Sequence, residues 1–156
     1  MKKLLCVWGS SNCGKTTAII EFDKILNHNF KGNVNCIYPP SPLRQPPNDI
    51  CRIYTIQYNR QPYTIGIESQ GDPNSRQHKS LDLFLKNNCD IIICASRTRG
   101  KTVSNVENFC RNYQYDSFWI STLYSVPMYN SYKNQMNQRT GQIIFDIVND
   151  FLNGIL

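Results

Sequence analysis

The feature that most constrains this chain is a glycine-bounded octapeptide near its start, residues 9–16, with the sequence GSSNCGKT. Residues 2–8 before it form a short apolar run typical of a buried strand, and residues 16–26 after it carry apolar side chains at helical spacing. A strand that turns through glycines into a helix is the repeating unit of proteins that layer helices on a sheet. The octapeptide therefore predicts an α/β fold.

The residue types of this octapeptide also suit the binding of phosphate groups. Its backbone N–H groups and those of the first helical turn would converge on the β-phosphate of a nucleotide. The ammonium of Lys15 is expected to bridge the β- and γ-phosphates, and the hydroxyl of Thr16 is expected to bind Mg²⁺. The predicted phosphate-binding residues are Gly9, Ser10, Ser11, Asn12, Cys13, Gly14, Lys15, Thr16 and Thr17.

With this motif and its flanks the sequence resembles the P-loop NTPase superfamily. The resemblance is strong over residues 1–28 and concerns only the order of the elements beyond them. It implies a P-loop NTPase fold, Mg²⁺ as a cofactor, and ATP or GTP as the ligand or substrate. It also implies a catalytic role for Lys15, which would stabilise negative charge in the transition state.

The remaining elements also alternate between strand and helix. Expected strands cover 33–38, 50–58, 63–68, 90–95 and 117–123, and expected helices cover 74–87, 102–111 and 138–152. The short polar connection 59–62 predicts a hairpin, and the strongly apolar run 90–95 predicts a central parallel strand. We therefore expect a three-layer α/β sandwich, a mostly parallel sheet with one antiparallel hairpin strand, formed by a single nucleotide-binding domain over residues 1–156.

A phosphate loop of this kind needs an acidic partner at the end of a neighbouring strand to hold the Mg²⁺ hydration shell. Glu68 is the candidate for this metal-binding and catalytic role, because it ends an apolar strand. Residues 68–71 (ESQG) also resemble the Asp-x-x-Gly switch of Ras-like GTPases, which implies that the Gly71 N–H meets the γ-phosphate. Asp72 is the reserve candidate for the metal. The alternative interpretation is a strand-end carboxylate followed by a turn-forming glycine.

The chain departs from the GTPase pattern in two places. No Asn-Lys-x-Asp motif for reading guanine follows the expected strand 117–123, so ATP and GTP remain equal candidates. The second departure concerns residues 39–49, which hold five of the eight prolines. Ser41 is the only hydroxyl residue among them, so no threonine there can serve as the first-switch Mg²⁺ ligand of the GTPase pattern. Proline lacks an N–H donor, so this segment is predicted to be a surface loop. It is the candidate contact for a protein partner.

A second, weaker match to the phosphate-loop pattern occurs at residues 95–102, with alanine in place of the first glycine. It too follows a strand and opens a helix. Arg97 and Arg99 within it are candidate anion-binding residues, because ligands of open α/β sheets bind at the carboxyl edge of the strands. The alternative is a solvated basic loop.

Composition excludes some classes of protein. The formal net charge is +6, but no run of basic residues indicates a nucleic-acid-binding arm. No apolar stretch is long enough for a membrane span. The seven cysteines form no C-x-x-C pair with a metal-like partner set, which favours reduced thiols and a cytoplasmic location.

Three functions fit these features. The first is an Mg²⁺-dependent ATPase or GTPase that hydrolyses the γ-phosphate. The second is a small P-loop nucleoside or nucleotide kinase, in which Arg97, Arg99 and Lys101 would clamp the phosphate acceptor. The third is a nucleotide-dependent protein-binding module with little turnover.

Overall fold

The computed structural model of the chain describes residues 1–40, 48–123 and 130–156. The proline-rich segment expected to contact a partner lies mostly outside these residues. Within them, strands and helices alternate along most of the chain. Their bounds are β1 (Lys3–Trp8), α1 (Lys15–Asn29), β2 (Val34–Tyr38), β3 (Cys51–Tyr58), β4 (Gln61–Glu68), α2 (Gln77–Lys86), β5 (Ile91–Ser96), α3 (Lys101–Tyr113), β6 (Asp116–Ser121) and α4 (Asn130–Leu152).

The strands form one mixed sheet in the order β2-β3-β4-β5-β1-β6. The β4–β5, β5–β1 and β1–β6 pairs are parallel, whereas β2–β3 and β3–β4 are antiparallel. β3 is therefore the one strand of the sheet that opposes the others, as the hairpin prediction required. The hairpin turns at Asn59 and Arg60, whose φ angles of 49° and 64° are typical of a two-residue turn that matches the sheet twist.

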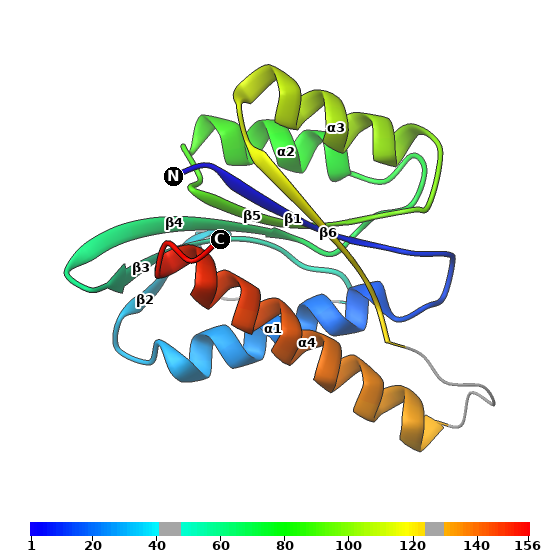
Figure 1. Cartoon of the computed structure of the whole chain (residues 1–156), viewed down its shortest axis with the longest axis horizontal. Coiled ribbons are helices and arrows are strands. Elements are labelled where there is room, and N and C mark those ends of the chain that lie inside the picture. The colour runs from blue at the N-terminus through cyan, green and yellow to red at the C-terminus, as the bar shows by residue number, and fades with distance from the viewer. Residues whose placement is uncertain (41–47, 124–129) are drawn as a thin grey trace.

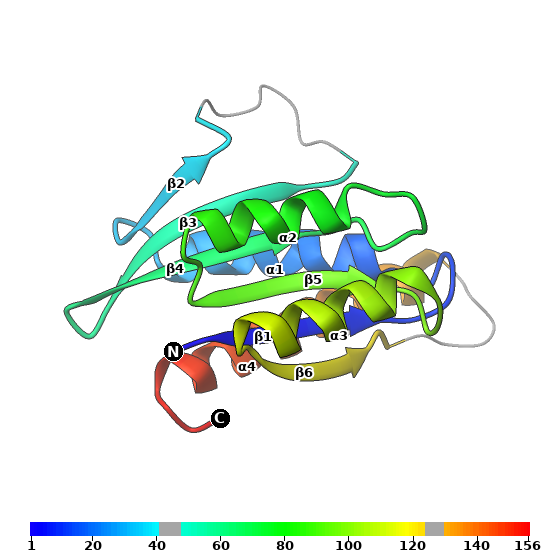
Figure 2. The same cartoon turned by 90° about the horizontal axis from the view of Figure 1, so that it is seen from above.

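Helices cover both faces of the sheet, so the molecule has three layers (Figures 1 and 2). Alternate residues of β1 divide between the two cores, because successive side chains of a strand point to opposite faces. Leu5 and Val7 pack with α1 and α4, and Leu4 and Cys6 pack with α2 and α3. All residues of β5 are buried, which confirms the prediction of a central parallel strand.

The strand order corrects one expectation. β5 lies between β1 and β4, so the strand that ends at Glu68 does not neighbour the strand that leads into the predicted phosphate loop. The reason is burial: β5 is apolar on both faces, and the centre of the sheet is where a strand is covered on both faces. This places β4 one strand further from the phosphate loop than we expected.

α4 is longer than predicted. It begins at Asn130 and not at Gln138, and it packs along α1 (Figure 1). Its first two turns are polar and lack the apolar stripe that marks a helix in a sequence. These turns lie against the glycine loop, where Asn137 packs on Gly14. Across the described parts of the chain, we find no helix with the length and apolar character needed to cross a bilayer.

Candidate active site

The phosphate loop, residues 9–16, connects β1 to α1. Gly14 precedes the helix with a φ of 89°, a left-handed conformation that suits glycine. The side chain of Lys15 is buried, and its Nζ donates to the carbonyl oxygens of Gly9 at 3.0 Å and Ser10 at 2.6 Å. No side chain caps the start of α1, and its first turn holds no acidic residue. The helix therefore presents free N–H groups and an unneutralised positive dipole end, the combination that binds anions.

A cavity of about 550 Å³ opens in front of this helix end, and we call it the loop cavity. Its volume lies in the range of small-molecule sites, about 300–1,000 Å³. The lining comprises Ser11, Asn12, Cys13, Gly14, Lys15, Thr16, Thr17, Asp49, Gln70, Gly71, Asp72, Pro73, Asn74, Ser75 and Lys133. The structure thus brings most of the predicted phosphate-binding residues around one space, with Gly9 and Ser10 behind them as acceptors for Lys15.

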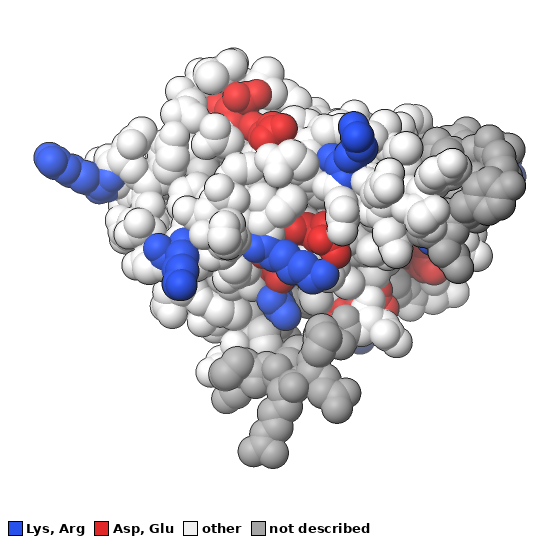
Figure 3. Space-filling view, turned by 90° about the horizontal axis from the view of Figure 1, so that it is seen from below, with Lys and Arg blue, Asp and Glu red and all other residues white. Residues whose placement is uncertain are grey.

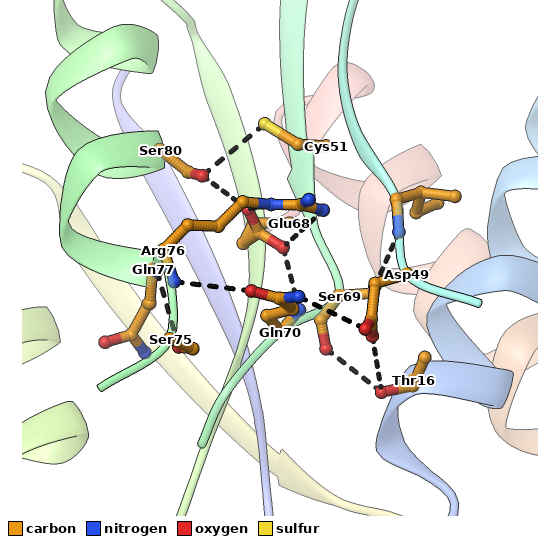
Figure 4. A network of polar contacts seen from close by, with 11 residues as sticks. Thr16, Asp49, Cys51, Glu68, Ser69, Gln70, Ser75, Arg76, Gln77 and Ser80 are labelled. Atoms are coloured by element: carbon orange, nitrogen blue, oxygen red, sulfur yellow. Dashed lines mark hydrogen bonds and ion pairs between the residues drawn. The ribbon is translucent and has the colours of Figure 1, made fainter. Parts of the chain in front are cut away.

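Thr16 faces a carboxylate that we did not predict from the sequence. Its Oγ1 lies 3.5 Å from Oδ1 of Asp49 and donates to the carbonyl of Ser69 at 3.2 Å (Figure 4). Asp49 also accepts from the Ser69 hydroxyl at 3.4 Å and from the Gln70 amide at 3.2 Å. Asp49 lies two residues before the start of β3. Because β3 is antiparallel, its start lies at the same edge as the end of β4, where Cys51 pairs with Glu68.

A hydroxyl and one carboxylate fit the needs of Mg²⁺, which usually takes one or two carboxylates and completes its shell with water and substrate phosphates. No cluster of three or more His, Cys, Asp or Glu residues within the described ranges could hold a metal ion by itself. A cation at Thr16 and Asp49 would therefore depend on a bound phosphate for further ligands.

Glu68 lies elsewhere in the same network. Its carboxylate is fully buried and forms an ion pair with Arg76, with Nε at 2.8 Å and Nη2 at 3.3 Å. It also accepts hydrogen bonds from the Ser80 hydroxyl and, at 2.8 Å, from the backbone N–H of Gln70 (Figure 4). These donors attach the turn after β4 to the start of α2. No hydrogen bond joins Glu68 to Thr16 in the described structure.

Gly71 lines the loop cavity and packs against the end of β5. A Cβ on Gly71 would lie 2.5 Å from the carbonyl carbon of Ala95, so the close approach leaves no room for a side chain. Asp72, the reserve metal candidate, is paired with Arg97, whose Nε lies 2.8 Å from Oδ1. This contact has the distance of an ion pair without the alignment of a hydrogen bond. Arg99 is exposed, and neither arginine lines the loop cavity.

A second cavity of about 640 Å³ adjoins the first, and we call it the helix cavity. It lies between α2 and the start of β3, and the two cavities share Asp49. Its basic lining residues are Arg52, Arg76, Lys79 and Lys86. Two of these are already paired with buried carboxylates, Arg76 with Glu68 and Arg52 with Asp23.

The outer face of α1 and α4 carries few charges. Figure 3 shows basic and acidic side chains interspersed on this face, with no continuous area of either sign. This face therefore lacks the basic patch that marks many nucleic-acid-binding surfaces.

No known protein-family model matches the chain, and a comparison with curated proteins finds no significant match.

Proposed function

We propose that this chain is a P-loop nucleoside triphosphatase that binds ATP or GTP with Mg²⁺ and hydrolyses the γ-phosphate. One observation carries the proposal. The uncapped start of α1 opens onto a cavity of about 550 Å³ that also holds Lys15 and the hydroxyl–carboxylate pair of Thr16 and Asp49. Amide donors, a buried ammonium and a candidate metal site around one space are what a polyphosphate requires.

The roles of the chain's residues follow from their contacts. Lys15 is held by two loop carbonyls and lines the cavity, where a phosphate oxygen would offer its ammonium a stronger, charged acceptor. Together with the amides of residues 11–17, it would stabilise the charge that develops during phosphoryl transfer. Thr16 and Asp49 would hold the metal. Mg²⁺ held there would neutralise part of the negative charge of the phosphates.

The attacking water needs a residue that orients it. Gln70 lines the loop cavity, and its side chain is oriented by two contacts, to Asp49 at 3.2 Å and from the backbone N–H of Arg76 at 3.3 Å. Glu68, the residue favoured by the sequence, is surrounded by donors from three residues, Gln70, Arg76 and Ser80. The contacts therefore favour Gln70 for the water and Asp49 for the metal. Glu68 would support both by positioning the turn that carries Gln70.

Phosphoryl transfer to a second substrate is the other candidate function, and the helix cavity favours it. This cavity adjoins Asp49 and carries Lys79 and Lys86, neither of which is paired with a described residue, so it offers an anionic acceptor a place beside the metal pair. The acceptor clamp expected from the sequence lies elsewhere. Arg97 is paired with Asp72, Arg99 is exposed, and Lys101 lines a cavity of only about 200 Å³.

Nucleotide labelled at the γ-phosphate separates these functions. The chain is incubated with Mg²⁺ and labelled ATP or GTP, with and without nucleoside monophosphates. Release of labelled inorganic phosphate supports hydrolysis, whereas label on the monophosphate identifies a kinase. Binding without either product indicates a nucleotide-dependent binding module. If calorimetry detects no association with ATP or GTP in the presence of Mg²⁺, the proposed function is wrong.

A further inference from the structure

One face of α4 follows α1 toward the phosphate loop. Residues 133, 137 and 141 are spaced by four and therefore share this face. At Gly141 the two helices touch closely: a Cβ there would lie 2.8 Å from Cβ of Glu21 and 3.0 Å from the backbone nitrogen of Phe22. The glycine thus sets how near α4 lies to α1.

One turn closer to the loop, Asn137 packs directly on Gly14. Asn137 is buried, and its Oδ1 lies 2.2 Å from the position that a Cβ on Gly14 would take. The segment before α4 is also attached, because the hydroxyl of Thr122 donates to the carbonyl of Cys13 at 2.7 Å. These contacts hold the first turns of α4 against the phosphate loop, in the part of the helix that the sequence did not predict.

One turn further still, Lys133 reaches the loop cavity. It is the one α4 residue in the lining, and Lys15 is the other basic residue there. Lys133 is half-buried, and it forms no ion pair or hydrogen bond with the residues that the structure describes. An ammonium at the cavity wall with no carboxylate partner among the described residues has its donors available for an anion that enters the cavity.

The charges of the cavity are consistent with such an anion. Of its two carboxylates, Asp72 is paired with Arg97 outside the lining, and Asp49 faces the hydroxyl of Thr16. A nucleoside triphosphate brings several negative charges, which Lys15 and one metal ion would neutralise only in part. An ammonium has three donors and no acceptor, so it matches phosphate oxygens better than the mixed edge of a base.

We propose that Lys133 is a second phosphate-binding cation, which contacts the polyphosphate of the nucleotide across the cavity from the phosphate loop. This inference rests on the proposed nucleotide site and assigns one wall of it to α4. Lys133 would raise affinity for the phosphates of ATP and GTP alike, with no preference for either base.

The test compares Lys133→Met with Arg139→Met by calorimetry in saturating Mg²⁺. Arg139 lies on the same helix, is exposed and does not line the cavity, so its substitution removes an equal charge without a cavity contact. The ligands are ATP, GTP and inorganic tripolyphosphate. We expect Lys133→Met to weaken all three by roughly tenfold, the effect of a lost charge-assisted hydrogen bond. Arg139→Met should change them by less than about twofold, and Lys133→Arg should restore most of the affinity.

Each other outcome overturns the inference. Equal affinities for Lys133→Met and Arg139→Met would show that Lys133 does not contact the ligand. Weakened binding of ATP and GTP with unchanged tripolyphosphate would assign Lys133 to the base or ribose. Lys15→Ala separates this failure from failure of the proposed function. If that variant loses binding while Lys133→Met keeps it, only the role of Lys133 is wrong. If the unsubstituted chain binds none of the ligands, both proposals are wrong.

Discussion

Two segments of this chain share a sequence pattern and a place in the sheet. Residues 9–16 follow β1, whereas residues 95–102 begin with the last two residues of β5. These adjacent parallel strands end side by side, with Trp8 paired to Ser96. Each segment has a glycine with positive φ immediately before a lysine that begins a helix, 89° at Gly14 and 92° at Gly100. Neither helix has a side-chain cap at its start.

The two segments differ in the space around them. The first opens onto a cavity of about 550 Å³, and its lysine curls back into the loop. Beside the second is a cavity of about 200 Å³, and the buried Thr102 hydroxyl accepts from the Arg97 backbone N–H at 3.2 Å. The Arg97 side chain is paired with Asp72. The backbone N–H and the side chain of Arg97 in the second loop are thus already paired with other protein groups. The second loop therefore has fewer donors for an anion, although its sequence pattern is similar.

The largest expected difference between the two loops is in their lysines. Lys15→Ala should weaken nucleotide binding by about a hundredfold or more, because it removes the buried ammonium that we propose contacts the phosphates. Lys101→Ala should leave affinity within about twofold, because Lys101 is exposed and outside the loop cavity. Calorimetry with ATP or GTP measures both variants, and circular dichroism verifies that each is folded. A comparable loss from Lys101→Ala would mean that the second loop also binds the nucleotide.

The two glycines provide the next comparison. Alanine at either position should lower the free energy of unfolding by about 1–3 kcal/mol, because both glycines have a positive φ that a residue with a Cβ rarely adopts. Only Gly14→Ala should also weaken nucleotide binding, by about tenfold or more, since its Cβ displaces Asn137 from the loop. At Gly100 no atom lies within 4 Å of an added Cβ. Thermal unfolding with and without nucleotide separates stability from binding, and equal nucleotide effects would contradict the comparison.

Asp49 and Glu68 lie near the same edge of the sheet, and we expect Asp49 to affect metal binding and Glu68 to affect stability. We expect Asp49→Asn to raise the Mg²⁺ concentration required for nucleotide binding by about tenfold, because a charged ligand is lost. Glu68→Gln should instead lower stability by about 1–3 kcal/mol, because it removes the charge opposite Arg76. Magnesium titrations and denaturant unfolding of both variants test this division. A shifted magnesium requirement in Glu68→Gln alone would return the metal role to Glu68.

The smallest expected effect is on the rate at which individual cysteine thiols are alkylated. Burial raises the pKa of Cys51 to about 11 and those of Cys89 and Cys110 to about 12, so these thiols stay protonated and react slowly at pH 8. Cys13 lines the loop cavity, whereas Cys36 is exposed on β2. Bound nucleotide should slow alkylation of Cys13 severalfold and leave Cys36 unchanged. Peptide mass spectrometry measures both rates, and equal rates with and without nucleotide would argue against a ligand at the loop.

The first unit of the fold could be predicted well from local sequence. The run before Gly9, the loop and the start of α1 lie within a few residues of their expected bounds, because periodicity and glycine placement are local signals. The hairpin and the buried strand β5 were predicted for the same reason. The first two turns of α4 were missed, because their polar residues are held by contacts with a loop more than a hundred residues earlier.

The candidate site was predicted only in part. The residues of the glycine loop could be predicted to lie around one space because they are contiguous, and their proposed role in phosphate binding stays a prediction. The carboxylate beside Thr16 could not be assigned, because sequence order does not reveal which strands are neighbours. We expected the strand ending at Glu68 to lie beside β1, but β5 separates them. Asp49, two residues before the opposing strand β3, faces Thr16 instead. The acidic residue shortly before the hairpin was the available signal.

The sequence by itself determined the alternation of strands and helices and the position of the glycine loop. These depend on the periodicity of apolar side chains and on residues that are adjacent in the chain. Only the tertiary structure decided which side chains join that loop: Asp49, Gln70 and Lys133 come from three separate segments. Their convergence depends on strand order and on how closely α4 packs against α1, and these follow from packing over the whole core, which no local pattern encodes.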